Sequence, residues 1–163
     1  MTFKNKIILL VLTFVVFLLL ACTLRVVLRP AEIVAIRHRS SGFSDILVKN
    51  FPYTDQGKIA WWLENKNDIE KKYHLPHPDK DGSFYLIFRL FGDGYKQEGK
   101  YDRLCFKYKV TPENCIDKNR VFSVQTGRNG NIIFIARGGV YRMTENGEIT
   151  KEKTWAIQPP PER

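Results

Sequence analysis

Hydrophobic and polar positions divide the chain into an unbroken apolar segment near its start and a longer part in which the two kinds alternate. Residues 7–24 carry no charge, and a helix built on them is apolar on every face. At about 1.5 Å per residue this helix is roughly 27 Å long, which matches the hydrocarbon core of a bilayer. The pattern predicts a membrane anchor over residues 7–28, preceded by a short cytoplasmic tail, residues 1–6.

The same apolar segment also resembles two kinds of cleaved signal. Lysines before it and Ala21 near its end are typical of a secretory signal peptide. The sequence Leu-Leu-Ala-Cys at residues 19–22 is similar to a bacterial lipobox, in which the cysteine after the cut is acylated. Leu20 stands where smaller residues are commoner, and apolar residues and arginines follow Cys22 directly. An uncleaved anchor is therefore favoured, while lipidation at Cys22 and plain cleavage remain alternatives.

The first part after the anchor has the periodicity of two strands followed by one helix. Residues 31–38 and 44–50 are rich in apolar and β-branched side chains, with a turn between them. Thr54 or Asp55 can cap a helix that ends by Leu75, because a proline follows. The apolar residues of this helix recur on one face and predict its buried side: Ile59, Trp62, Leu63, Ile69 and Tyr73.

Trp61 is the exception on this helix, because it points about 100° away from Trp62. That direction places it at the edge of the buried face. The residue is either a partly buried core side chain or an aromatic contact for a ligand or a partner protein, and we keep it as a candidate contact.

The second half has the pattern of an antiparallel meander. Short runs with strand periodicity are separated by turn signals, among them Asn129-Gly130 and Asn146-Gly147. One helix followed by such a meander predicts an α+β domain over residues 31–154, with a mostly antiparallel sheet. The proline-rich residues 155–163 are expected to form an extended tail. The predicted strands are 83–91, 101–109, 120–125, 131–137 and the two runs around Asn146-Gly147.

The chain has three cysteines, and two of them lie in the predicted domain. Cys105 and Cys115 can meet across a looped segment that contains Thr111-Pro112. A disulfide there would stabilise the domain by about 2–4 kcal/mol. Because disulfides persist in oxidising compartments, the pair favours a domain in the periplasm. The alternative is two unrelated reduced thiols in a cytosolic domain.

The positive-inside rule gives no support to that orientation. Two lysines, Lys4 and Lys6, precede the apolar segment, whereas four arginines follow it: Arg25, Arg29, Arg37 and Arg39. Counting alone would place the domain in the cytoplasm, so the orientation depends on the cysteines.

Charge and motifs argue against several classes of function. The 26 Lys and Arg exceed the 17 Asp and Glu, but after residue 30 they are scattered among acids as on a solvated surface, and no nucleic-acid-binding motif is present. Residues 94–101 match only the start of a P-loop, so we expect no nucleotide. Residues 74–81 gather histidines and aspartates without metal-ligand spacing. We therefore expect no metal, no cofactor and no catalytic residues.

Several segments resemble an uncharacterised family of enterobacterial membrane proteins. The likeness is strongest in IAWWLENK (59–66) and DGYKQEGKYDRLCF (93–106), and it covers roughly residues 24–150. The resemblance implies an N-terminal membrane segment and transfers no catalytic or binding residues.

Together these observations predict a single-pass protein of the cell inner membrane with a periplasmic domain. Its expected role is non-catalytic recognition of a protein partner, as an accessory or immunity-like factor. The alternatives are a lipoprotein anchored at Cys22, a binding module for an anionic envelope ligand such as a lipid headgroup, and an envelope enzyme whose pocket the sequence does not reveal.

Overall fold

The computed structural model describes residues 3–27, 29–39, 42–127 and 129–152. The chain divides into two compact units, Met1–Pro30 and Ala31–Arg163, and each is described by itself. We call the second unit the head domain. The predicted proline-rich tail, residues 155–163, lies outside the described residues.

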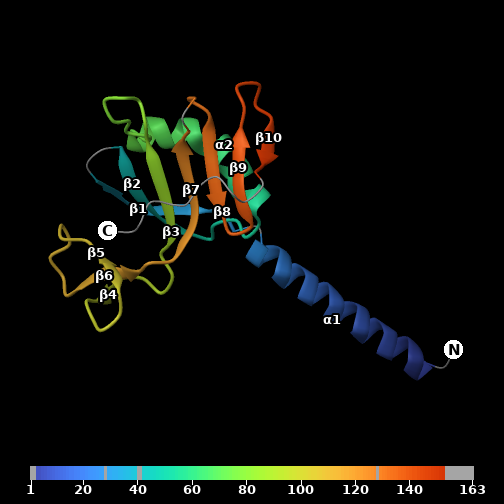
Figure 1. The fold of residues 1–163 in the computed structure, drawn as a ribbon. Helices are drawn as coiled ribbons and strands as arrows, with labels where there is room; N and C mark the ends of the chain where they lie inside the picture. Colours follow the sequence, from blue (N-terminus) through green and yellow to red (C-terminus); the bar gives the residue numbers. More distant parts are fainter. Residues whose placement is uncertain (1–2, 28, 40–41, 128, 153–163) are drawn as a thin grey trace. The chain divides into compact units, whose positions relative to one another are not determined.

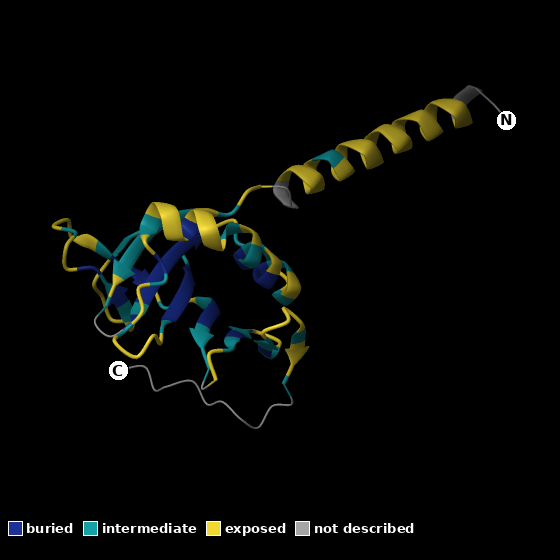
Figure 2. Ribbon diagram, turned by 90° about the horizontal axis from the view of Figure 1, so that it is seen from above, coloured by how far each residue is buried: buried dark blue, intermediate teal, exposed yellow. Residues whose placement is uncertain are grey.

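The first unit is the helix α1 (Phe3–Val27), whose described side chains are almost all exposed (Figure 2). Asn5–Arg25 is long and apolar enough to cross a membrane, and its place near the N-terminus is also typical of a signal sequence. The hydroxyl groups of Thr13 and Thr23 donate to carbonyl oxygens one turn back, at 2.9 Å and 2.8 Å. The polar groups of these residues are thus satisfied inside the helix, as a lipid environment requires.

A seven-stranded sheet forms the frame of the head domain (Figure 1). Its strand order is β1-β2-β3-β7-β8-β9-β10, and every neighbouring pair is antiparallel except β2 and β3. The bounds are β1 (Glu32–His38), β2 (Phe43–Lys49), β3 (Tyr85–Leu90), β7 (Arg120–Thr126), β8 (Ile132–Ala136), β9 (Gly139–Met143) and β10 (Ile149–Lys151).

The helix α2 (Asp55–Tyr73) connects the two parallel strands and lies across one face of the sheet (Figure 1). It begins where the sequence predicts, because the Thr54 hydroxyl accepts from the Gly57 N–H at 3.1 Å. It ends before Leu75 because His74 adopts a left-handed conformation, with φ of 54°, and donates its N–H to the Glu70 carbonyl.

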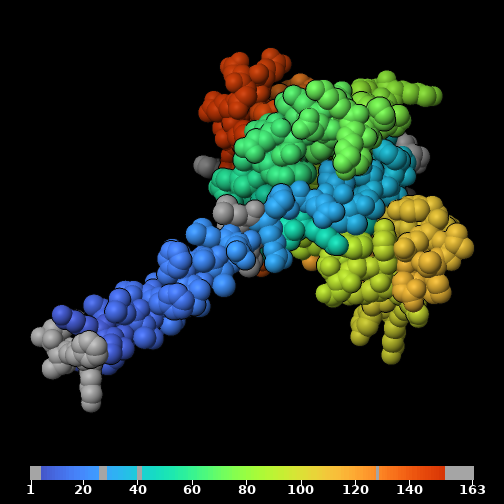
Figure 3. Space-filling model, turned by 180° about the vertical axis from the view of Figure 1, so that it is seen from behind, coloured from blue at the N-terminus to red at the C-terminus, as the bar shows by residue number. Residues whose placement is uncertain are grey.

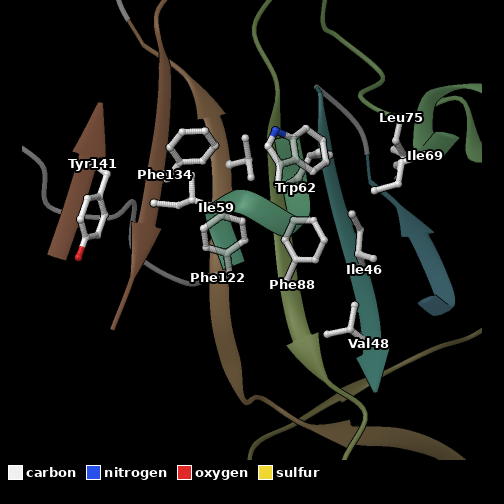
Figure 4. Packing of buried hydrophobic residues seen from close by; sticks show 12 residues of the cluster. Ile46, Val48, Ile59, Trp62, Ile69, Leu75, Phe88, Phe122, Phe134 and Tyr141 are labelled. Carbon is white, nitrogen blue, oxygen red and sulfur yellow. The ribbon is translucent and has the colours of Figure 1, made fainter. Parts of the chain in front are cut away.

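The main core lies between α2 and the face of the sheet that it covers. Ile59 and Trp62 of α2 lie over Phe88 and Phe122 in the middle of the sheet (Figure 4). The rings of Phe88 and Phe122 are 5.5 Å apart, and Trp62 packs edge-on against Phe88 at 6.0 Å. Aromatic pairs of this kind add to the free energy gained from burial alone.

A second, three-stranded sheet is inserted between β3 and β7. It consists of β4 (Lys96–Gln97), β5 (Arg103–Cys105) and β6 (Glu113–Asp117) in the order β4-β6-β5. Figure 3 shows it as a lobe, coloured olive to orange, at the side of the head domain. Residues of this insertion pack with Leu47 of β2 in a second apolar cluster: Leu104, Phe106 and Ile116.

Ion pairs and hydrogen bonds hold the three short strands together. Asp117 of β6 accepts from Lys96 of β4 and, at 3.1 Å, from Nε of Arg103 in β5. Both contacts, the one to Lys96 first, hold the pKa of the Asp117 carboxyl below its ordinary value.

The α+β prediction is confirmed, but two details of it are wrong. The predicted strand 101–109 is only Arg103–Cys105, because the chain turns after Phe106 and Lys109 donates its N–H to the Phe106 carbonyl. The meander is limited to β7–β10, since residues 96–117 form a sheet of their own.

A charged cluster is buried within the sheet. Both carboxylate oxygens of Asp45 accept from arginines, from Nε of Arg39 at 2.8 Å and from Nε of Arg89 at 2.9 Å. Asp45 and Arg89 are buried, and Arg39 is partly exposed. Because a buried charge needs a partner, this cluster fixes the β1–β2 hairpin against β3.

Replacing Phe88 with alanine tests the core. We predict that Phe88→Ala lowers the free energy of unfolding by about 3–5 kcal/mol, since it leaves a cavity among the rings around it. Urea unfolding of the full chain in mild detergent, followed by tryptophan fluorescence, measures the effect. The matched control is Tyr101→Ala, an exposed ring, which should change stability by less than about 0.5 kcal/mol. Equal losses for both variants would contradict this packing.

Candidate functional site

A cleft of about 790 Å³ opens in the head domain at the start of α2. Pockets of this size are typical of sites that bind small molecules or peptide side chains. Parts of the chain that are distant in sequence form its walls, namely residues 51–55 with Lys58, Leu90, residues 119–122, and residues 135–138.

The topology of the sheet brings these stretches to the same end. Strands β2, β3 and β8 finish there and β7 begins there, since Phe122 pairs with both Phe88 and Ala136. The chain leaves β2 through Phe51 and enters α2 at Asp55. The cleft is thus built around the point where the parallel crossover begins.

The floor of the cleft is apolar. It includes Phe51, Leu90, Phe122 and Ile135. The ring of Phe51 stacks on Phe88 with centroids 5.3 Å apart, and Trp61 packs edge-on against it at 5.0 Å. The floor therefore continues directly into the main core, which makes it rigid.

Asp55 joins the start of α2 to the opposite wall. Its Oδ2 accepts from the Gly138 N–H at 2.8 Å and from the Tyr141 hydroxyl at 3.0 Å, and its Oδ1 lies 3.6 Å from Nζ of Lys58. A Cβ on Gly138 would lie 2.5 Å from Oδ2, so only glycine permits this approach. The carboxylate is thus occupied by contacts within the fold.

Positive charge dominates the lining. Lys58, Arg120 and Arg137 line the cleft, and Asp55 is the acidic residue among the lining side chains. Within the part of the chain that the structure describes, Arg120 and Arg137 form no ion pair. The N-terminus of α2 adds the positive end of a helix dipole. The arrangement suits an anionic group.

Burial raises the pKa of Tyr141 above its ordinary value, and the hydrogen bond to Asp55 raises it further. The hydroxyl therefore stays protonated and donates to the carboxylate over the whole physiological range of pH.

The structure places the residues singled out in the sequence in three separate locations. Cys105 and Cys115 face each other across β5 and β6 and form a disulfide. Trp61 is half-buried against Phe51 and does not line the cleft, so its role as a contact stays a prediction. Cys22 is exposed on α1, and its lipidation also stays a prediction.

The histidines and aspartates of residues 74–81 do not form a metal-ligand set. Among the described residues, no three His, Cys, Asp or Glu side chains gather as such a set would require. The aspartates instead bond within their own turn, where the Asp81 carboxylate accepts from the hydroxyl and the N–H of Ser83.

Reasoning from sequence did not identify the cleft. Its cations lie on three separate elements, Lys58 in α2, Arg120 at the start of β7 and Arg137 after β8. The sequence did hold one signal, a lysine on the buried side of an amphipathic helix. This is Lys58, which lies one turn after Asp55, the first residue of α2.

Removal of the Asp55 carboxylate tests how strongly it joins the two walls. We predict that Asp55→Ala lowers the free energy of unfolding by about 2–3 kcal/mol, because hydrogen bonds to a charged acceptor are lost. Asp68→Ala, at an exposed position of α2, is the matched control and should be nearly neutral. Chemical unfolding of the full chain compares the two variants. If Asp55→Ala leaves the free energy of unfolding unchanged, the hydrogen bonds of Asp55 contribute nothing to stability.

Alkaline pH tests the Tyr141 contact. A raised folded-state pKa gives stability that is complete below pH 10 and is lost as pH rises through the folded pKa. Tyr141→Phe should thus cost about 1 kcal/mol at pH 8, and this deficit should shrink above pH 10. Unfolding measured from pH 8 to 11.5 provides the comparison, with Tyr101→Phe as an exposed control. A deficit that stays constant with pH would be contrary to this assignment.

Comparison with known proteins identifies the family of the chain but assigns no function to it. A family model described as "Enterobacterial putative membrane protein (DUF943)" matches residues 2–153. Neither the curated proteins nor the solved structures give a match. The match covers α1 and nearly the whole head domain, which confirms the resemblance seen in the sequence. The chain is therefore a member of this enterobacterial family of membrane proteins.

Proposed function

We propose that the protein is anchored in the cell inner membrane by α1 and recognises another protein with a head domain in the periplasm. In this role it acts without catalysis, as an accessory or immunity-like factor. The observation that carries the proposal is the preformed cleft with its apolar floor and cationic walls.

The disulfide supports the periplasmic location. Cys105 and Cys115 are directly opposite in an antiparallel pair, so their side chains are held next to each other by the strands themselves. Two cysteines in that position would remain reduced thiols in the cytoplasm and would form a lasting disulfide in the periplasm. Lys and Arg flank the apolar segment, residues 7–24, on both sides, so the cysteines carry more weight than the charge count.

The state of Asp55 supports binding over catalysis. A general base must have an oxygen within reach of the proton that it removes. Both oxygens of Asp55 already face groups of the fold, the Gly138 N–H and the Tyr141 hydroxyl at one oxygen and Lys58 at the other. The other charged groups of the cleft are cations, which attract a ligand and hold it in place.

Lipid attachment at Cys22 is the alternative form of the anchor. The residue is exposed on α1, and it ends the sequence Leu-Leu-Ala-Cys, at the position that is acylated in a lipobox. In either form the head domain stays on the same side of the membrane, so the proposed recognition does not depend on which anchor is used.

A second candidate function is contact with an anionic envelope surface. In the loop closed by the disulfide, Val110 is 98% exposed and Tyr108 is 60% exposed, with Lys107 beside them. Apolar and aromatic side chains interleaved with lysines are typical of segments that touch anionic lipid headgroups.

Labelling with a membrane-impermeant maleimide tests the orientation in growing cells, in a Cys22→Ser background. We predict that wild-type Cys105 and Cys115 resist labelling until a reductant is added. In Cys115→Ser, the remaining Cys105 should react in intact cells, because it faces the periplasm. The matched control, Lys4→Cys, should react only after lysis, since residue 4 precedes the anchor.

The reverse pattern, with Lys4→Cys labelled in intact cells and Cys105 labelled only after lysis, would overturn the proposed location. The mass of the membrane-bound protein with Cys22 intact separates the two anchors, because lipobox processing removes the first 21 residues and adds acyl chains at Cys22.

A further inference from the structure

We propose that the cleft at the start of α2 binds an acidic, partly apolar segment of the partner protein. This inference rests on the proposed function and specifies the chemistry of the partner. The segment would place carboxylates against Lys58, Arg120 and Arg137 and an apolar side chain on the floor between them.

The imbalance of charge is the first argument. The carboxylate of Asp55 is shared among the Gly138 N–H, the Tyr141 hydroxyl and Lys58, so it is already neutralised within the fold. Arg120 and Arg137 have no ion-pair partner among the described residues, although both face the same cleft. Guanidinium groups recognise carboxylates through paired hydrogen bonds, which a lysine cannot reproduce.

The burial of Lys58 is the second argument. Its side chain is only 7% exposed, and the distance to Asp55 is 3.6 Å, longer than a hydrogen bond. A largely desolvated ammonium with one distant counter-charge would gain free energy from a second, closer anion. A ligand carboxylate in the cleft would supply that anion.

The distribution of the cations is the third argument. One stands on α2, one at the start of β7 and one in the turn after β8, and all three line the same cleft as the apolar floor residues. A single small anion could occupy only part of a cleft of about 790 Å³ and would leave the apolar floor uncovered. A peptide carries carboxylates and apolar side chains in alternation, which fits both features.

The rim offers an anchor for such a peptide. Tyr53 lines the cleft, and its side chain is among the most exposed large side chains of the head domain. Tyrosine is enriched among the hot spots of protein interfaces, where it is buried on binding. Tyr53 would cover the bound segment from the solvent side.

Selection from a random heptapeptide display library tests the inference without assuming a sequence. The target is the full chain in phosphatidylcholine nanodiscs, with empty nanodiscs for counter-selection. Selected peptides should combine Asp or Glu with Phe, Leu or Trp. Replacing their acids with the corresponding amides should weaken binding by at least about tenfold in fluorescence anisotropy.

Matched variants locate the binding. Arg120→Gln and Arg137→Gln should each raise the Kd by about three- to tenfold, and together they should abolish selection. Lys107→Gln removes the same charge outside the cleft and should change the Kd by less than about twofold. Lys58 is left unchanged in these variants, because it is buried and its replacement would first disturb folding.

Three results would overturn the inference. They are selected peptides without acidic residues, equal binding by the Arg120→Gln/Arg137→Gln variant, and binding to anionic phospholipid vesicles but to no peptide.

Photo-crosslinking in cells, with benzoylphenylalanine in place of Tyr53, distinguishes failure of the acidic-segment inference from failure of the proposed protein recognition. A crosslinked protein that persists in the double arginine variant would leave protein recognition standing and remove the acidic partner. The absence of any crosslinked protein together with an empty selection would remove both.

Discussion

The parallel pairing of β2 with β3 is the constraint on which the rest of the head domain depends. Two parallel neighbours cannot be joined by a tight turn, so the chain must cross from one end of the sheet to the other. The helix α2 makes this crossing, and its apolar face covers Phe88 and Phe122 as it does so. The crossing also puts the start of α2 beside the end of β2, which is where the cleft opens.

Strand β2 is buried on both of its faces, and this explains the inserted sheet. Ile46 and Val48 point into the core under α2, whereas Leu47 between them points to the opposite face. That face would meet water without the insertion, whose Phe106 and Ile116 pack with Leu47. The disulfide therefore lies in the inserted lobe and not among the residues that line the cleft.

The sequence was sufficient for α2 and for the strands of the main sheet, but not for the small inserted sheet or for the way the elements assemble. The Thr54 cap and the proline after Leu75 marked α2 correctly, because those signals are local. The strand predicted at 101–109 was too long, since its alternation continued into a turn that no local signal marked. The parallel pairing of β2 with β3 and the cleft could not be predicted, for the same physical reason. Arg120 and Arg137 come beside Lys58 only after the strand order is set, and that order is decided by packing between distant segments.

Hydrogen exchange of the full chain in nanodiscs, measured by mass spectrometry with and without a reductant, tests this account most directly. The account predicts that α2, β2, β3, β7 and β8 exchange slowly and together, because they share one core. It also predicts that reduction of the disulfide speeds exchange only between residues 96 and 117. The account is contradicted if α2 loses its protection separately from β2 and β3. It is also contradicted if reduction of the disulfide speeds exchange throughout the seven-stranded sheet.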